Sequence, residues 1–195
     1  MAREASTQVA DRLRRVSVGG WLRLAVIGCV ALALSLAALA HAAAPTPNQA
    51  KSLIGHTAPS FTAPAAQSGQ TLAQPVSFDG RSGRRTLLVF FDTLCVHCLT
   101  GVQTAGQIAL EPGLPPLDIM YVDAPGENAD ITGKYMARLR IDAPVLLDHD
   151  ARIASRYGVA YYPSFILVDS HGIVRAVWTG TPTASELRAA IAHTG

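Results

Sequence analysis

The stretch Thr86-Leu-Leu-Val-Phe-Phe91-Asp-Thr-Leu-Cys95-Val-His-Cys98 decides the fold. It opens with an apolar run rich in β-branched and aromatic side chains, which is typical of a buried strand. The residues after Cys95 favour a helix that ends near Leu110, where Glu111-Pro112-Gly113 follows. A strand that places Cys-x-x-Cys at a helix start indicates redox chemistry. The unpaired N–H groups and the roughly +0.5 charge of a helix N-terminus favour a thiolate over a thiol.

The two cysteines then have separate expected roles. We expect Cys95 at the helix terminus to be the attacking thiol, and Cys98, one turn further in, to be the resolving thiol. The Cys95 thiolate would attack a partner disulfide, and Cys98 would then displace the partner and leave an internal disulfide. His97 lies between them and adds positive charge when protonated, so we expect it to tune the thiols. A purely structural disulfide is the alternative interpretation of the pair.

The composition divides the chain of 195 residues into two parts. Residues 1–44 carry five arginines against two acidic residues, whereas the remainder carries eleven Lys/Arg against twelve Asp/Glu. The later part therefore has no basic surface, which argues against nucleic acid as a partner. Of the three cysteines, Cys29 lies in the apolar leader, where we interpret it as an ordinary apolar residue. The remaining pair is too few for a disulfide-stapled scaffold.

The leader predicts how the protein is located. Residues 1–20 form a basic cytoplasmic region, and residues 21–44 are a transmembrane anchor or a signal peptide, because they are long and apolar enough to span a bilayer. Small residues at Ala40 to Ala44 also suit a cleavage site. Residues 45–52 form a linker, and residues 53–195 form the domain. We expect the domain to face the periplasm from the inner membrane, or to be periplasmic or secreted if the leader is cleaved.

The rest of the chain predicts alternating strands and helices. We expect a loose β-hairpin over residues 63–85, strands at 86–91 and 117–122, and a hairpin of strands at 159–168 and 173–178; residues 144–147 form a short apolar run. Helices are expected at 96–110, 128–140 with Asn128 as N-cap, 150–157 with Asp150 as N-cap, and 183–193 with a capping box at Thr183 and Glu186. This order indicates an α/β domain, a central mixed sheet flanked by helices.

These residues together resemble the thioredoxin superfamily, and more narrowly the membrane-tethered TlpA/ResA group of extracytoplasmic thiol–disulfide oxidoreductases. The resemblance covers about residues 53–193. Its motifs are Gly55-x-x-Ala58-Pro59-x-Phe61, Thr93-Leu-Cys95-Val-His-Cys98, Pro144-Val-Leu-Leu-Asp148, Tyr157-Gly-Val159 with Pro163, and Asp169-x-x-Gly172.

The resemblance implies a thioredoxin-like sandwich and an enzyme without cofactor or metal. It implies that Pro163 is cis and faces the cysteine pair, with the backbone of Tyr162 able to bind a substrate chain; a trans proline at a strand edge is the alternative. The implied partners are protein thiols and disulfides, among them apocytochrome c in cytochrome c biogenesis or copper-site assembly proteins.

The sequence departs from that family at four positions. Leu94 stands where reductases usually carry tryptophan, and His97 where many carry proline. The two acids that usually move the proton of the buried thiol are missing: Val89 stands at the thioredoxin position and Gly101 at the ResA position. Asp92 is the nearest carboxylate in sequence, and we interpret it as a solvated residue at a strand end.

The direction of electron flow depends on two opposing signals. A histidine between the cysteines is shared with disulfide isomerases and the periplasmic oxidant, whose potentials lie near −180 and −120 mV against about −270 mV for thioredoxin. The span from thioredoxin to the oxidant, roughly 150 mV, equals about 7 kcal/mol for two electrons. His97 therefore favours an oxidase or isomerase, whereas the wider resemblance favours a reductase, which is our prediction.

Two other functions are compatible with parts of the sequence. A peroxidase of the peroxiredoxin type shares the fold, but Leu88 stands near the site where its Pro-x-x-x-Thr-x-x-Cys pattern needs proline. A copper-delivery module would use two thiolates and a histidine, ligands that suit soft metals, but its Cys-x-x-x-Cys is one residue longer than the spacing here. We interpret the remaining histidines outside the leader as solvated surface residues: His56, His149, His171 and His193.

Overall fold

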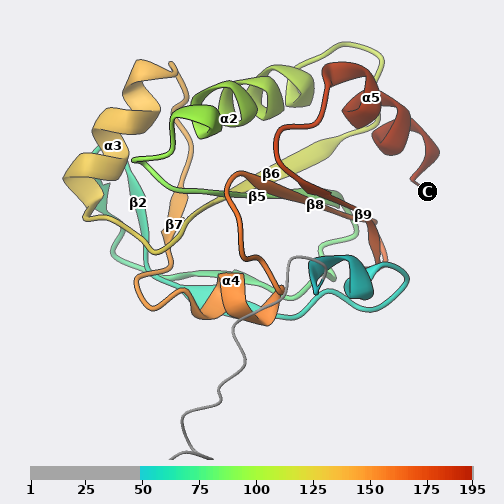
Figure 1. Ribbon diagram of the computed structural model, residues 1–195, viewed down its shortest axis with the longest axis horizontal. Coiled ribbons are helices and arrows are strands. Elements are labelled where there is room, and N and C mark those ends of the chain that lie inside the picture. The colour runs from blue at the N-terminus through green and yellow to red at the C-terminus, as the bar shows by residue number, and fades with distance from the viewer. Residues whose placement is uncertain (1–48, 195) are drawn as a thin grey trace, which may run out of the picture. The chain divides into compact units, whose positions relative to one another are not determined.

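The computed structural model describes residues 49–194, so the predictions for residues 1–48 lie outside the described part. Strand β5 (Arg85–Phe91) lies inside a seven-stranded sheet of order β3-β2-β7-β6-β5-β8-β9. Every residue of β5 from Thr86 onward is buried, as expected of a central strand covered on both faces. Figure 1 shows α2 and α5 on one side of these strands and α4 on the other.

The other elements follow in chain order. The strands are β1 (Phe61–Ala63), β2 (Ala65–Gln67), β3 (Gln70–Thr71), β4 (Val76–Phe78), β6 (Leu117–Asp123), β7 (Val145–Leu147), β8 (Ser164–Val168) and β9 (Val174–Thr179). The helices are the 3-10 helix η1 (Ala50–Leu53), α2 (Val96–Ala109), α3 (Ala129–Arg138), α4 (Arg152–Arg156) and α5 (Ala184–His193).

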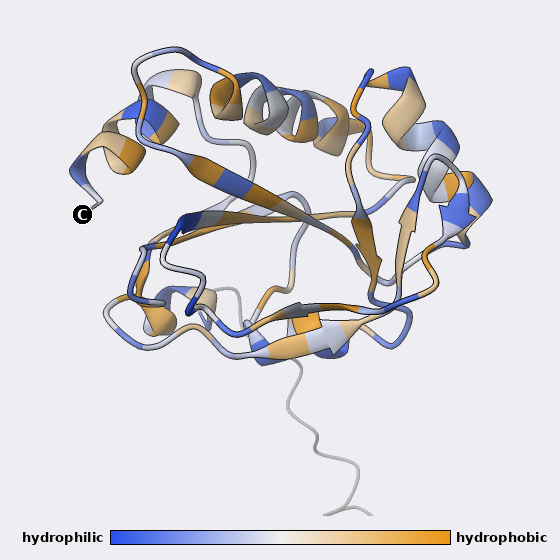
Figure 2. Cartoon of the chain, turned by 180° about the vertical axis from the view of Figure 1, so that it is seen from behind, coloured by the Kyte–Doolittle hydropathy of each residue, from blue (hydrophilic) through white to orange (hydrophobic). Residues whose placement is uncertain are grey.

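The predicted mixed sheet between helices is confirmed. Strands β6 and β7 run parallel to β5, whereas β8 pairs with β5 in the antiparallel sense. Alternate side chains of β5 enter two apolar clusters, with Leu88 and Phe90 in one and Val89 and Phe91 in the other. In Figure 2 hydrophobic colours run along the central strands, while hydrophilic colours mark many of the surrounding turns.

The residues that precede the sheet pack against its last hairpin. The N–H of Ala58 donates to the carbonyl of Gly172 at 2.8 Å, and the buried Tyr157 hydroxyl donates to the carbonyl of Pro59 at 2.6 Å. The Phe61 ring stacks on Phe78 with centroids 5.2 Å apart. The first motif of the family resemblance is therefore explained by packing.

Three local features differ from the expectation. Residues 63–85, where we expected one loose hairpin, hold the short strands β2, β3 and β4. Strand β4 pairs with the preceding β1, whereas β2 pairs with β3 and with β7. Helix η1 includes residues 50–52, which we assigned to the linker. Strand β8 begins only at Ser164, after Pro163.

The predicted N-cap of α4 is wrong. Asp150 makes no capping hydrogen bond and instead pairs with Arg152 at 3.1 Å. The carboxylate of Asp148 accepts from the N–H groups of Ile153 and Ala154 at 3.1 and 2.9 Å. The aspartate at the end of β7 thus supplies the capping interaction from further back along the chain, which brings the start of α4 onto the sheet edge.

Gly133 in α3 generates a stability prediction. A Cβ at this position would overlap the backbone of Gly69 in the turn between β2 and β3, which cannot move away like a side-chain end. Gly133→Ala should therefore lower the free energy of unfolding by about 1–3 kcal/mol, although helix propensity alone would raise it by about 1 kcal/mol. Urea unfolding measures the change.

Gly106→Ala in α2 is the matched control. Its Cβ would meet the Tyr121 hydroxyl at 3.2 Å and the tip of Ile141 at 3.3 Å, both of which are side-chain ends. The loss should be smaller than for Gly133→Ala. Equal stability of Gly133→Ala and the natural chain would contradict the close approach of α3 to this turn.

Candidate active site

The turn between β5 and α2 is held by Asp92. Its carboxylate Oδ1 accepts the N–H of Leu94 at 2.7 Å, and its backbone carbonyl accepts the N–H of Cys95 at 3.1 Å. Cys95 is the N-cap of α2, with extended backbone angles of φ −82° and ψ 108°. The structure therefore places the Cys95 sulfur at the positive end of a 14-residue helix.

Cys95 and Cys98 form a disulfide with their Cα atoms 5.3 Å apart. Cys95 is partly exposed, whereas Cys98 is fully buried in the apolar cluster beneath α2. A partner can therefore approach only the outer sulfur. This asymmetry agrees with an attacking and a resolving thiol, because exchange requires access to the attacking sulfur.

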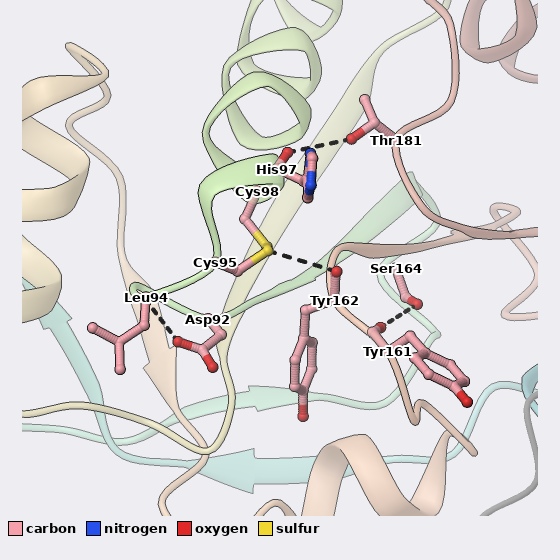
Figure 3. Close-up of a disulfide and its surroundings, with 9 residues drawn as sticks. All are labelled: Asp92, Leu94, Cys95, His97, Cys98, Tyr161, Tyr162, Ser164 and Thr181. Atoms are coloured by element: carbon pink, nitrogen blue, oxygen red, sulfur yellow. Dashed lines mark hydrogen bonds between the residues drawn. A yellow bond between two sulfur atoms is a disulfide. The ribbon is translucent and has the colours of Figure 1, made fainter.

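Tyr162 and Pro163 lie next to the disulfide, as Figure 3 shows for Tyr162. The Sγ of Cys95 lies 3.6 Å from the Tyr162 carbonyl oxygen, and the Tyr162–Pro163 peptide bond is cis. Tyr162 and Pro163 form a corner before β8, and a hydrogen bond of 2.8 Å from the Gly180 N–H to the Pro163 carbonyl holds this corner. The Tyr162 ring points away from the sulfurs, so its backbone, not its ring, faces the pair.

His97 occupies an exposed position in the first turn of α2. Its carbonyl accepts a long hydrogen bond of 3.5 Å from the Thr181 hydroxyl. Figure 3 shows its ring on the Thr181 side of the helix, opposite Leu94 and Asp92. Among the described residues, no hydrogen bond engages the ring.

The two missing acids have a physical explanation. A Cβ at Gly101 would lie 2.9 Å from the Phe165 ring and 3.0 Å from the Thr181 hydroxyl oxygen, so no larger side chain fits there without displacing them. Val89 is fully buried in the apolar cluster that also holds Cys98. At Gly101 the neighbouring side chains thus leave no room for an acid, and at Val89 an apolar side chain occupies the position.

The turn between β5 and α2, which leads to Cys95, is called the redox turn below. Sequence reasoning missed a buried carboxyl near it, that of Asp123 at the end of β6. It is fully buried, and desolvation raises its pKa, while hydrogen bonds from the Thr132 hydroxyl and the Glu127 N–H oppose that rise. Its position is a usable sequence signal, because the carboxyl ends of parallel strands meet at one edge of a sheet. Each of the strands β5, β6 and β7 ends at or just before an aspartate: Asp92, Asp123 and Asp148.

Exposed apolar side chains stand next to Cys95 and next to Tyr162 in the chain. Leu94 and Val96, on either side of Cys95, are 79% and 76% exposed, and Tyr161 is 54% exposed. Large apolar side chains that remain in solvent beside a reactive group indicate a contact surface for a partner.

The histidines His56, His149, His171 and His193 are all exposed. Within residues 49–194 no three or more His, Cys, Asp or Glu side chains gather in a way that could hold a metal ion. None of the helices described in that range is long and apolar enough to cross a membrane.

Comparison with known proteins agrees with this geometry. Residues 54–177 match the AhpC/TSA family. A thiol-disulfide oxidoreductase, ResA, from Geobacillus thermodenitrificans is 24% identical over 106 residues, which cover 54% of this chain and 60% of the relative. The match thus spans less than two thirds of that relative's length.

Two solved structures share the fold. A secreted disulfide oxidoreductase from Mycobacterium tuberculosis, homologous to Escherichia coli DsbE, superposes with a TM-score of 0.56 and 19% identity, covering 68% of this chain and 94% of the other. A 2-Cys peroxiredoxin from Plasmodium vivax gives a TM-score of 0.56 and 18% identity, covering 71% and 94%. With the cysteine pair on the first turn of α2 and the cis proline beside it, this chain has a thioredoxin-like fold and belongs to the AhpC/TSA family.

Proposed function

We propose that this protein is an extracytoplasmic thiol–disulfide oxidoreductase that exchanges the Cys95–Cys98 dithiol and disulfide with partner proteins. The observation that carries the proposal is the asymmetry of the pair. The outer sulfur is accessible at a helix N-terminus, and the inner sulfur is buried beneath it. A structural disulfide needs no such arrangement.

The exchange follows from this geometry. In the reduced protein the Cys95 thiolate, stabilised by the helix terminus, attacks one sulfur of a partner disulfide and releases the other as a thiolate. Cys98 then attacks Cys95 Sγ, the mixed disulfide breaks, and the partner leaves reduced. The carbonyl of Tyr162, 3.6 Å from Cys95 Sγ, marks where an extended partner chain would lie beside the outer sulfur.

The exposed apolar side chains define the kind of partner. Leu94 and Val96 present apolar surface on either side of Cys95, and Tyr161 does so next to Tyr162. A segment whose cysteine is flanked by apolar residues therefore suits the site. Such segments are accessible in unfolded chains and seldom on the surface of a folded protein. Apocytochrome c or a copper-site assembly protein is therefore the kind of partner that we propose. No cofactor enters this reaction, because both electrons reside in the sulfur pair.

The cellular location is part of the proposal. Residues 1–20 would lie in the cytoplasm, residues 21–44 would anchor the chain or direct its export, and residues 45–52 would tether the domain of residues 53–195. The resemblance to the TlpA/ResA group favours a reductase, whereas His97 favours a more oxidising potential, so the measured reduction potential decides the direction of electron flow.

A peroxidase is the second candidate, because the AhpC/TSA match and the Plasmodium peroxiredoxin both point to it. The sequence before Cys95 lacks the expected proline, since Leu88 stands near that site. Consumption of hydrogen peroxide by the reduced protein at the rate of disulfide exchange would favour the peroxidase.

Substitution of each cysteine tests the exchange. The natural chain, reduced with dithiothreitol, should reduce the disulfides of insulin, and both Cys95→Ser and Cys98→Ser should lose this turnover. Cys98→Ser should retain partners as mixed disulfides on Cys95, which mass spectrometry identifies. Cys95→Ser is the matched control, because the buried Cys98 should capture no partner. Full turnover by Cys95→Ser would leave the pair as a structural disulfide.

His97→Pro tests the tuning of the thiols. Proline fits the first turn of a helix, where the N–H has no intrahelical partner, so α2 should form normally. The reduction potential, measured by equilibration with a glutathione buffer, should become more negative. A natural potential above about −180 mV would exclude the reductase assignment, and one near −270 mV would show that His97 has no influence.

A further inference from the structure

Because the thiol of Cys98 is buried, it needs a proton acceptor other than bulk water. Before Cys98 can attack, its thiol must lose a proton, because only the thiolate is a nucleophile. Burial in apolar surroundings opposes this ionisation. The two positions that carry acids in relatives are filled here by Val89 and Gly101, and packing excludes an acid at the latter.

Three aspartates lie at the carboxyl ends of adjacent parallel strands, but only one has a free buried oxygen. Asp92 is partly exposed and binds the Leu94 N–H through Oδ1. Both oxygens of Asp148 accept N–H groups at the start of α4. Asp123 Oδ2 accepts the Thr132 hydroxyl at 2.6 Å and the Glu127 N–H at 3.2 Å, whereas its Oδ1 has no partner among the described residues.

Asp123 lies beside the redox turn. It is the strand partner of Phe91, and the next residue, Ala124, donates its N–H to the Phe91 carbonyl at 2.9 Å. The Phe91 ring stacks on Tyr135 with centroids 5.1 Å apart, and both rings belong to the same buried cluster as Cys98. The carboxyl therefore borders the packing that encloses the inner sulfur.

Two further buried oxygens in this region lack partners. The Tyr135 hydroxyl, on the helix turn after Thr132, and the Thr93 hydroxyl, in the turn that leads to Cys95, have no hydrogen bond within the described part of the chain. Buried polar groups are normally satisfied, and water is the usual partner where protein groups are absent. A carboxyl and two hydroxyls at one sheet edge are suited to hold water and pass a proton.

The charges around Asp123 favour proton binding. Desolvation raises its pKa, and the charges of Asp92 and Glu127 raise it further. Two phenols from other elements are close enough to be affected by the charge of Asp123. Burial, and then that charge, raise the pKa of Tyr135 on α3 to about 12, and burial and the charges of Asp148, Asp92 and Asp123 raise the pKa of Tyr162. The charge of Arg138 lowers the pKa of Tyr135. No cation pairs with Asp123 among residues 49–194.

We propose that Asp123 is the buried group that takes the proton from Cys98 when the internal disulfide forms and returns it when the disulfide is reduced. This inference rests on the proposed function. Asp123 makes no hydrogen bond to either sulfur, so it acts through water as a positioning residue and not by direct contact.

Proton transfer comes first, and the exchange of sulfur bonds follows it. Cys98–SH and the Asp123 carboxylate become the Cys98 thiolate and the Asp123 carboxylic acid. The thiolate forms a bond to Cys95 Sγ, the bond from Cys95 to the partner sulfur breaks, and the partner leaves as a thiolate that takes up a proton. Reduction of the internal disulfide runs the same transfers in reverse.

Oxidised glutathione is the probe for the resolving step. It reacts with the reduced protein to give a glutathione mixed disulfide on Cys95, which Cys98 then resolves. Samples quenched with acid and alkylated give the amounts of mixed and internal disulfide by mass spectrometry at each pH. We expect Asp123→Asn to slow resolution by about tenfold or more and to remove one inflection from its pH profile.

Asp118→Asn is the matched control. Asp118 lies on the same strand, but it is only partly buried and pairs with Arg84 at 2.7 Å. Its loss removes one negative charge from β6 without touching the buried oxygens. Resolution in this variant should follow the natural pH profile.

Thr132→Val separates proton transfer from a structural role. The Thr132 hydroxyl lowers the pKa of Asp123, so its removal should move the inflection to higher pH. A carboxyl that only supports the fold predicts no such movement. This variant also decides the question if Asp123→Asn does not fold.

Urea unfolding supplies the folding control. Because the Asp123 pKa is raised in the folded state, the natural chain should lose stability as pH rises through that pKa. Asp123→Asn should lack this loss.

Unchanged resolution in Asp123→Asn, or an unmoved inflection in Thr132→Val, overturns the proton role. If the natural chain forms no mixed disulfide with glutathione, the proposed function itself fails.

Discussion

The site depends on the position of one sulfur at the N-terminus of a helix. Cys95 is the N-cap of α2, and no described side chain caps that terminus with a hydrogen bond. The orphan N–H groups of the first turn are therefore available to a negative charge on the sulfur. Every other feature of the site keeps this geometry: β5 fixes the direction of approach, Asp92 closes the turn, and the Tyr162 carbonyl covers one side of Cys95.

The sheet explains why the functional groups meet where they do. In β5, β6 and β7 the parallel strands bring their carboxyl ends to one edge, and the antiparallel β8 begins at that same edge just after Pro163. The cysteine turn, the buried Asp123 and the cis proline therefore come from three separate parts of the chain. A central strand that is buried on both faces makes this edge rigid, which helps to hold small groups in register.

The sequence predicted the parts of this arrangement that depend on local patterns. The helix α3 begins after Asn128 as predicted, because that side chain accepts the Ile131 N–H, and α5 has the expected capping box at Thr183. The cap of α4 was assigned to the wrong aspartate, since Asp148 reaches the helix from the end of a strand and not from the position that local rules select. Nonlocal contacts, such as that of Gly133 with Gly69, leave no local pattern to read.

Asp123 shows the same limit at the site. The family resemblance implies an acid on the strand or the helix that carries the cysteines, and those two positions hold Val89 and Gly101 in this chain. The geometry of Gly101 shows why that route is closed, because the Phe165 ring and the Thr181 hydroxyl fill the space that an acid would need. A carboxyl on the neighbouring strand β6 does not need the space beside Gly101. Packing around Cys98 therefore bears on the position of the proposed proton acceptor: the Phe165 ring leaves no room for an acid at Gly101 on α2, and the buried carboxyl stands instead at the carboxyl end of β6.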